Sequence, residues 1–93
     1  MINPKIIKIR EKLDKLDNKL LKIIKLRMNL VNQVLKQKNF KKQIVDKKRI
    51  RIILKTIRKK SIKDNIDPKI TEKIWRSMIN SFIDYEFRNF KKK

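Results

Sequence analysis

Cysteine, histidine, glycine and alanine are all absent from this sequence of 93 residues, and proline occurs only twice. Without cysteine and histidine the chain can form neither disulfides nor ordinary zinc sites, and it has no thiol nucleophile or imidazole base. The lack of glycine also excludes a glycine-rich phosphate-binding loop. Any catalysis must therefore use the side chains of Arg, Lys, Asp, Glu, Ser or Tyr.

Long hydrophobic runs are missing as well. Charged residues interrupt every apolar stretch, so no segment predicts a membrane span. Residues Met1–Arg10 lack the apolar run and the small-residue cleavage site of a signal peptide. We therefore expect a cytoplasmic protein that forms one domain over residues 1–93.

Acidic residues are few. Nine of them stand against 29 Lys and Arg, which gives a formal net charge of +20. Such a surplus can mark a surface for nucleic acid, anionic lipid or a small polyanion. It can also reflect a composition rich in Lys, Ile and Asn, whose codons are rich in A and T. We favour the compositional explanation for most of the lysines, because they are spread evenly along the chain.

The N-terminal forty residues have the pattern of a long amphipathic helix. Asn3 and Pro4 form a typical helix start, an N-cap followed by proline at the first helical position. The residues of one face then recur at alternating steps of three and four. These are Ile6, Ile9, Leu13, Leu16, Leu20, Ile23, Arg27, Leu30 and Val34. About 36 helical residues span about 54 Å, whereas a compact chain of this length has a radius of gyration of about 12 Å. A helix this long needs a partner.

Two further helices are expected in the rest of the chain. Asn39–Val45 is a short polar connection, after which Asp46 can cap a second, short helix. Ser61–Ile66 is predicted to be the next loop. Asp67 and Pro68 repeat the cap-and-proline start, and a third helix of medium length is expected from Pro68 to about Phe90. Residues Lys91–Lys93 are expected to form a frayed tail. The predicted fold class is all-α.

Three charged residues fall where apolar residues are expected. Arg27 occupies a step of the apolar face of the first helix, and Lys38 follows eleven residues later, about 20° from the same direction. Glu86 lies at the helical interval between the apolar residues of the third helix. Because unpaired buried charge is costly, each must meet an opposite charge. That charge is either an internal ion pair, Glu86 with Arg27 or Lys38, or an external anion.

Arg10 lies beside the apolar face, 28 residues before Lys38 and about 42 Å away along the rod. No small ligand can touch both within one chain. Arg10 is therefore either a solvated surface residue or a residue that serves the site of a second subunit.

At this point the residues resemble a known family, the all-helical chorismate mutases. The stretch IREKLDKLDNKLLKIIKLRMNLVNQVLKQK is similar to the first helix of the family, with Arg10, Arg27 and Lys38 at the family's intervals. VDKKRI resembles the start of its second helix. IWRSMINSFIDYE resembles its third, ending in Glu86 where the family carries Gln or Glu.

The resemblance implies an intertwined helical homodimer with two sites, each completed by the first helix of the partner. It implies an isomerase that converts chorismate to prephenate by an intramolecular Claisen rearrangement, in aromatic amino acid biosynthesis, without metal or cofactor. Such a reaction depends on orientation and preorganised electrostatics.

The resemblance also implies a role for each site residue. Arg10 from the partner and Arg27 hold the carboxylates of the dianionic substrate, for which the guanidinium fork is suited. Lys38 and Glu86 donate to the ether oxygen that gains negative charge. Arg49 supports the ring region, and the loop near Asp46 contacts the hydroxyl group.

Two positions depart from the common mutase pattern. Ile50 stands where a Glu is common, and Phe82 where a Ser is common. Both departures are closer to the isochorismate-pyruvate lyases, which share the fold and produce salicylate. A lyase is therefore the first alternative.

Two non-enzymatic classes compete with an enzyme. A basic nucleic-acid-binding protein is disfavoured, because the cations surround every predicted helix. A coiled-coil scaffold explains the repeat of three and four but not Arg27 and Glu86 within it.

Overall fold

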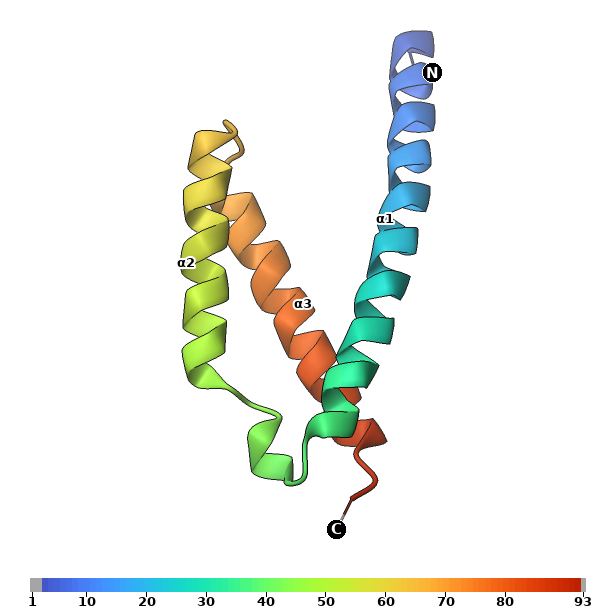
Figure 1. The fold of residues 1–93 in the computed structure, drawn as a ribbon. Coiled ribbons are helices and arrows are strands. Elements are labelled where there is room, and N and C mark those ends of the chain that lie inside the picture. The colour runs from blue at the N-terminus through green and yellow to red at the C-terminus, as the bar shows by residue number, and fades with distance from the viewer. Residues whose placement is uncertain (1–2, 93) are drawn as a thin grey trace. The chain divides into compact units, whose positions relative to one another are not determined.

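The computed structural model describes residues 3–92 and contains helices only (Figure 1). The elements are α1 (Pro4–Gln37), a 3-10 turn η1 (Lys41–Gln43), α2 (Lys47–Lys63) and α3 (Pro68–Asn89). No strand occurs within the described residues. The prediction of an all-α chain with a long, a short and a medium helix is confirmed. The chain divides into two compact units, Met1–Val31 and Asn32–Lys93, which are described separately.

The predicted starts of α2 and α3 are confirmed. The Asp46 carboxylate accepts a hydrogen bond from the backbone N–H of Arg49 at 3.0 Å, and Asp67 accepts one from Lys69 at 2.9 Å. Each satisfies a backbone donor that the first helical turn leaves without a partner. The starts of both helices are therefore fixed by capping residues within one turn of the helix.

The end of α2 differs from the prediction. The helix continues through Ser61 to Lys63, and the loop comprises residues 64–67. Asn65 adopts a left-handed conformation with φ of 58°, which Asn tolerates better than most residues. The N–H of Ile66 then bonds to the carbonyl of Ser61 at 2.8 Å, and the N–H of Asn65 to that of Ile62 at 3.3 Å. This pair of bonds is a Schellman motif with Asn in the usual place of Gly.

Ser61 remains helical because its hydroxyl is satisfied inside the protein. Its Oγ lies 2.7 Å from both the carbonyl of Ile57 and Oγ1 of Thr71 on α3. The Oγ1 of Thr71 also lies 3.3 Å from the carbonyl of Pro68, so the two hydroxyl protons serve three contacts and either hydroxyl can donate to the other. Both side chains are buried, and this chain of hydrogen bonds fixes α2 against α3.

Within the first unit, the apolar face of α1 is exposed. The large side chains of that face that lie in this unit are exposed by about half: Ile6 43%, Ile9 57%, Leu13 53%, Leu16 57%, Leu20 54%, Ile23 53% and Leu30 59%. Burying a Leu or Ile side chain gains about 1.5–3 kcal/mol, so a single chain forgoes a large stabilisation along this helix.

The second unit has its own small core. Leu35, in the last turns of α1, and Ile44, after η1, are buried, and α2 packs against α3. The hydroxyl of Tyr85 donates to Oδ1 of Asn32 at 2.8 Å, which ties α3 to the end of α1. Lys92 donates to the carbonyl of Lys36, so this part of the predicted frayed tail is held. Lys93 lies outside the described residues.

The helices of residues 3–92 include none that is long and apolar enough to cross a bilayer.

Candidate active site

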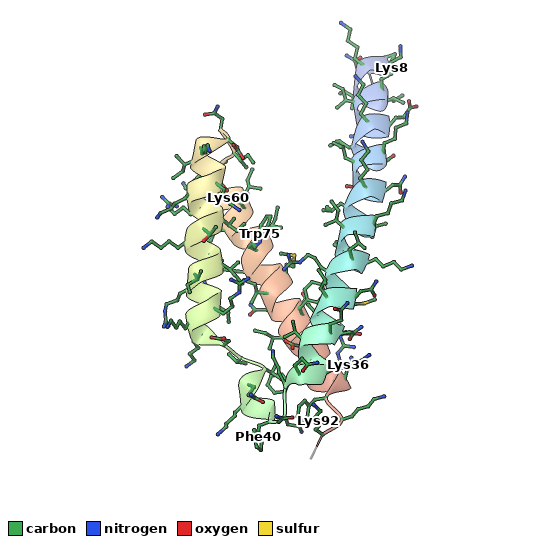
Figure 2. The ribbon with its side chains drawn as sticks, in the orientation of Figure 1. Lys8, Lys36, Phe40, Lys60, Trp75 and Lys92 are labelled. Atoms are coloured by element: carbon green, nitrogen blue, oxygen red, sulfur yellow. The ribbon has the colours of Figure 1, made fainter. Side chains whose placement is uncertain are left out.

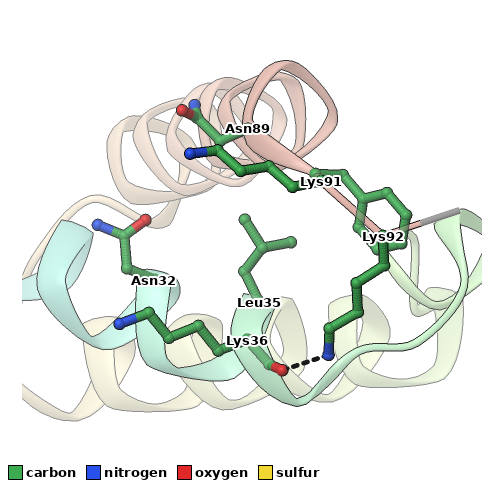
Figure 3. Close-up of a pocket in the computed structure, with 7 residues that line it drawn as sticks. Asn32, Leu35, Lys36, Asn89, Lys91 and Lys92 are labelled. Carbon is green, nitrogen blue, oxygen red and sulfur yellow. Dashed lines mark hydrogen bonds between the residues drawn. The ribbon is translucent and has the colours of Figure 1, made fainter.

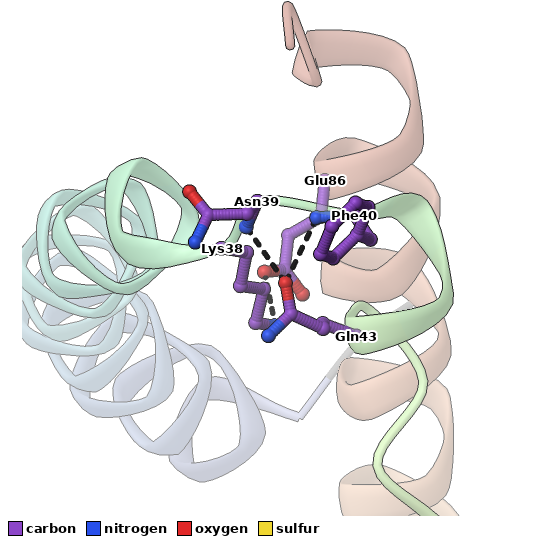
Figure 4. A network of polar contacts seen from close by, with 5 residues as sticks. All are labelled: Lys38, Asn39, Phe40, Gln43 and Glu86. Atoms are coloured by element: carbon purple, nitrogen blue, oxygen red, sulfur yellow. Dashed lines mark hydrogen bonds and ion pairs between the residues drawn. The ribbon is translucent and has the colours of Figure 1, made fainter. Parts of the chain in front are cut away.

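Lys38 and Glu86 form an ion pair in the second unit (Figure 4). The Lys38 Nζ donates to Oε1 of Glu86 at 2.8 Å, and the two side chains are only 17% and 8% exposed. Of the two internal partners that the sequence allowed for Glu86, the structure shows Lys38. An ammonium has three protons, so this bond leaves Lys38 able to donate to a further acceptor.

Lys38 points inward, as its spacing from Arg27 predicted, and its side chain is 17% exposed. α1 ends at Gln37, one residue earlier. The N–H of Lys38 still bonds to the carbonyl of Leu35 at 3.1 Å. From that last turn the side chain meets Glu86 on α3.

The side chain of Gln43 holds the loop that follows Lys38. Its Oε1 accepts from the backbone N–H groups of Asn39 at 2.7 Å and Phe40 at 2.8 Å (Figure 4). The N–H of Gln43 in turn bonds to the carbonyl of Phe40 at 3.0 Å. The loop is anchored next to this clamp by Ile44, which is only 3% exposed. The backbone on the C-terminal side of Lys38 is therefore fixed.

An open concavity of about 640 Å³ lies beside this loop. It is lined by Lys38, Lys42, Gln43, Val45, Asp46 and Lys47. Its size is within the range of small-molecule sites, and three of its six lining residues are lysines. It is open to solvent, and its lining also includes the carboxylate of Asp46.

Asp46 and Arg49 meet at the start of α2. The carboxylate of Asp46 is engaged by the backbone N–H of Arg49, and both side chains are exposed. Asp46 thus lines the concavity as the cap of α2, while Arg49 lies one turn further along the helix.

Arg10 and Arg27 belong to the first unit. Arg10 is exposed, whereas Arg27 is half-buried on the otherwise apolar face of α1. Among the six predicted site residues, the structure thus brings together the side chains of Lys38 and Glu86, while Asp46 meets Arg49 through the backbone N–H that it caps.

Comparison with protein families gives one decisive finding. Residues 9–87 match chorismate mutase type II. The chain belongs to this family. Searches of curated proteins and of solved structures found no match.

The family match covers every predicted site residue, from Arg10 to Glu86. Among residues 3–92 no group of three or more carboxylates is placed to hold a metal ion.

Sequence reasoning missed Gln43 as a part of this site. Its signal was present, because a Gln at the third position of a short helix often bonds back to the preceding backbone N–H groups. The connection Asn39–Val45 was instead predicted as an undifferentiated polar loop.

A second concavity, of about 300 Å³, lies between the C-terminal ends of α1 and α3 (Figure 3). Leu35 points into it, and Lys36, Lys91 and Lys92 surround it. Lys92 is engaged by the carbonyl of Lys36. None of the predicted site residues lines this concavity.

Proposed function

We propose that this protein is a chorismate mutase, which rearranges chorismate to prephenate. The observation that carries the proposal is the largely buried Lys38–Glu86 pair, whose Lys38 lines an open concavity with two further lysines, within a chain of the chorismate mutase type II family. In the reaction the ether C–O bond breaks while a C–C bond forms, and no atom is gained or lost. The site needs only to select the compact conformer and stabilise charge on the ether oxygen.

Lys38 donates to the ether oxygen in this proposal. Its ammonium is already held in place by Glu86 at 2.8 Å and by the fixed loop that follows it. Such a preorganised donor contributes most where charge develops, because no reorganisation is needed during the reaction. Glu86 donates to the same oxygen when its carboxyl group carries a proton.

The two carboxylates of the substrate are held by Arg27 and by Arg10 of a second copy of the chain. Arg49 supports the ring region, and the Asp46 loop contacts the hydroxyl group. This arrangement requires a homodimer in which each chain, as one domain, lends its first helix to the other. The half-exposed apolar face of α1 supports this dimer, because a second copy of the same face would bury it.

An isochorismate-pyruvate lyase is the second candidate. The observation in its favour is that Ile50 and Phe82, at the two positions that depart from the mutase pattern, are both half-buried. Neither offers the polar contact that a mutase commonly has there.

Incubation of the purified protein with chorismate and, separately, with isochorismate tests the proposal. We expect prephenate from chorismate. Salicylate and pyruvate from isochorismate, with no prephenate from chorismate, would assign the lyase activity instead. No product from either compound, in a protein shown to be folded by circular dichroism, would exclude both.

A further inference from the structure

Helix α2 has an unusual charge distribution. Nine of its 17 residues are Lys or Arg, and none is acidic: the cations are Lys47, Lys48, Arg49, Arg51, Lys55, Arg58, Lys59, Lys60 and Lys63. All nine side chains are exposed. None forms an ion pair with a described residue.

The charges of α3 are arranged differently. Arg76 pairs with Glu72 at 3.2 Å and Arg88 with Asp84 at 2.9 Å, each one turn apart. Such pairs stabilise a helix, and like charges at the same spacing destabilise it. α2 therefore bears an electrostatic cost that α3 avoids.

The cations of α2 also form a continuous ridge. Lys47, Arg51, Lys55, Lys59 and Lys63 follow one another at intervals of four residues. With a rise of 1.5 Å per residue, these five are about 6 Å apart and extend over about 24 Å. Four successive like-charge contacts follow this ridge, which turns by about 160° around the helix, and no ion pair within residues 3–92 compensates them.

The opposite side of α2 is apolar and already in use. Ile50, Ile53, Leu54, Ile57 and Ser61 are its buried or half-buried residues, and α2 packs against α3. At 100° per residue, the nine cations occupy about 220° of the remaining circumference. Figure 2 shows nitrogen-tipped side chains projecting from α2 on the side away from α3.

The cations of α2 could bind an anionic membrane or nucleic acid, and the rest of the helix distinguishes these two ligands. An amphipathic helix binds a membrane by inserting its apolar side, which in α2 is covered by α3. The cationic side has no aromatic residue, Asn or Gln, since its other members are Ile52, Thr56 and Ile62. It therefore lacks aromatic groups that stack on bases and amides that recognise adenine. Most of its cations are lysines, six of nine, which bind phosphates as point charges.

We propose that the exposed side of α2 is a binding surface for the phosphate backbone of nucleic acid, without sequence preference. Duplex DNA carries one negative charge per about 1.7 Å of axis, so phosphates are spaced more closely than the cations, and the cations of the ridge that face the duplex can each meet one. Nucleic acid was disfavoured from the sequence because cations occur on every helix. The three helices differ in their acidic residues, however: α1 and α3 contain Asp and Glu, whereas α2 contains neither. This binding does not require the proposed mutase activity, although Lys47 and Arg49, at the N-terminal end of α2, also belong to the proposed active site.

Two variants of equal charge test the proposal. Lys55→Gln/Lys59→Gln/Lys63→Gln removes three cations from the ridge. Lys15→Gln/Lys22→Gln/Lys25→Gln removes three exposed cations from α1 and is the matched control. Neither set includes a residue of the proposed active site, so mutase turnover serves as a check on folding in both.

The measurement is fluorescence anisotropy of two labelled 20-base-pair DNA duplexes of unrelated sequence, between 50 and 200 mM KCl. We expect the wild-type protein to bind both equally. The α2 variant should bind at least tenfold more weakly at the lowest salt, and its slope of log K against log salt should be flatter by about 2 to 3. The α1 variant should stay within about threefold of wild type, because its cations lie outside the ridge.

Equal losses in the two variants would overturn the proposal, because they would show that only total charge matters. Absence of binding at 50 mM KCl would overturn it as well. Vesicles of phosphatidylserine and poly-L-glutamate are the alternative polyanions. If either binds the wild-type protein more tightly than the duplexes do, with the same dependence on α2, the assignment to nucleic acid is wrong.

A single substitution gives an independent readout. Lys55→Glu places an acid one turn from both Arg51 and Lys59. If the ridge is kept for binding at the expense of stability, this variant should melt at a higher temperature than wild type and bind the duplexes more weakly. A lower melting temperature, or unchanged binding, would contradict the proposal.

Discussion

The ammonium of Lys38 lies 2.8 Å from Oε1 of Glu86, and both side chains are largely buried. The pair joins the last turn of α1 to α3, and it is also the centre of the proposed catalytic site. Since a buried charge that loses its partner is costly, each residue serves stability and chemistry together. The substitutions below separate these two roles.

Substitution of Lys38 by Met should lower both stability and turnover. The Glu86 carboxyl would be left buried without its cation, at a cost of about 2 to 4 kcal/mol in the free energy of unfolding. Turnover should fall by about 10²–10³-fold, because a donor to the developing charge is lost. Urea unfolding and steady-state kinetics measure the two effects.

The double variant Lys38→Met/Glu86→Gln is the control for Lys38. It removes the buried unpaired charge, so stability should largely return while turnover stays low. Recovery of turnover together with stability would show that Lys38 has a structural role only.

Substitution of Glu86 by Gln should make turnover less dependent on pH. A carboxyl group can donate a hydrogen bond only when protonated, whereas an amide always carries N–H donors. We therefore expect wild-type turnover to fall as pH rises and the variant to keep its activity on the alkaline side. The measurement is turnover against pH for both proteins, with circular dichroism at each point.

Either of two results would remove Glu86 as a donor. One is a wild-type rate that does not decline at alkaline pH. The other is a folded Glu86→Gln protein that is inactive throughout. Glu86 would then be the structural partner of Lys38.

The comparison of sequence and structure shows which features are local. The caps at Asp46 and Asp67 were predictable, because they depend on residues within one turn. The continuation of α2 through Ser61 was not, because its hydroxyl is satisfied partly by Thr71, ten residues away on α3. Helix propensities and turn signals depend on neighbouring residues only, so they cannot predict the hydrogen bond between Ser61 and Thr71.

The same distinction applies to the site. The periodicity placed Glu86 on an inner face but left its partner open between Arg27 and Lys38, since that choice depends on tertiary packing. The apolar face of the first helix was predictable from its repeat of three and four, and its side chains are exposed in the structure. The partner of this helix stays a prediction.

Substitution of Arg27 by Lys should impair substrate binding although the charge is kept. A guanidinium binds a carboxylate through two parallel hydrogen bonds, and an ammonium cannot reproduce that geometry. We expect KM to rise by at least tenfold, with a smaller change in kcat. Unaltered KM in a protein with the wild-type melting temperature would remove Arg27 from the substrate clamp.

Substitution of Gln43 by Met should release the loop after Lys38. The N–H groups of Asn39 and Phe40 lose their common acceptor, so their hydrogen exchange should accelerate. A loosened Lys38 should lower kcat by about tenfold or more. Gln43→Glu retains the acceptor oxygen and should preserve both slow exchange and kcat, while its added negative charge raises KM. Slow exchange in Gln43→Met would show that the clamp does not fix the loop.

In the proposed dimer each active site combines Lys38 of one chain with Arg10 of another. Mixing Arg10→Ala dimers with Lys38→Ala dimers tests this arrangement, with subunit exchange verified by mass spectrometry. In a heterodimer one site then carries both lesions and the other carries neither. We predict that each homodimer is nearly inactive. Each heterodimer should regain about half of the wild-type rate, because one of its two independent sites is intact. A mixture that exchanges subunits fully and yet stays inactive would contradict the shared site.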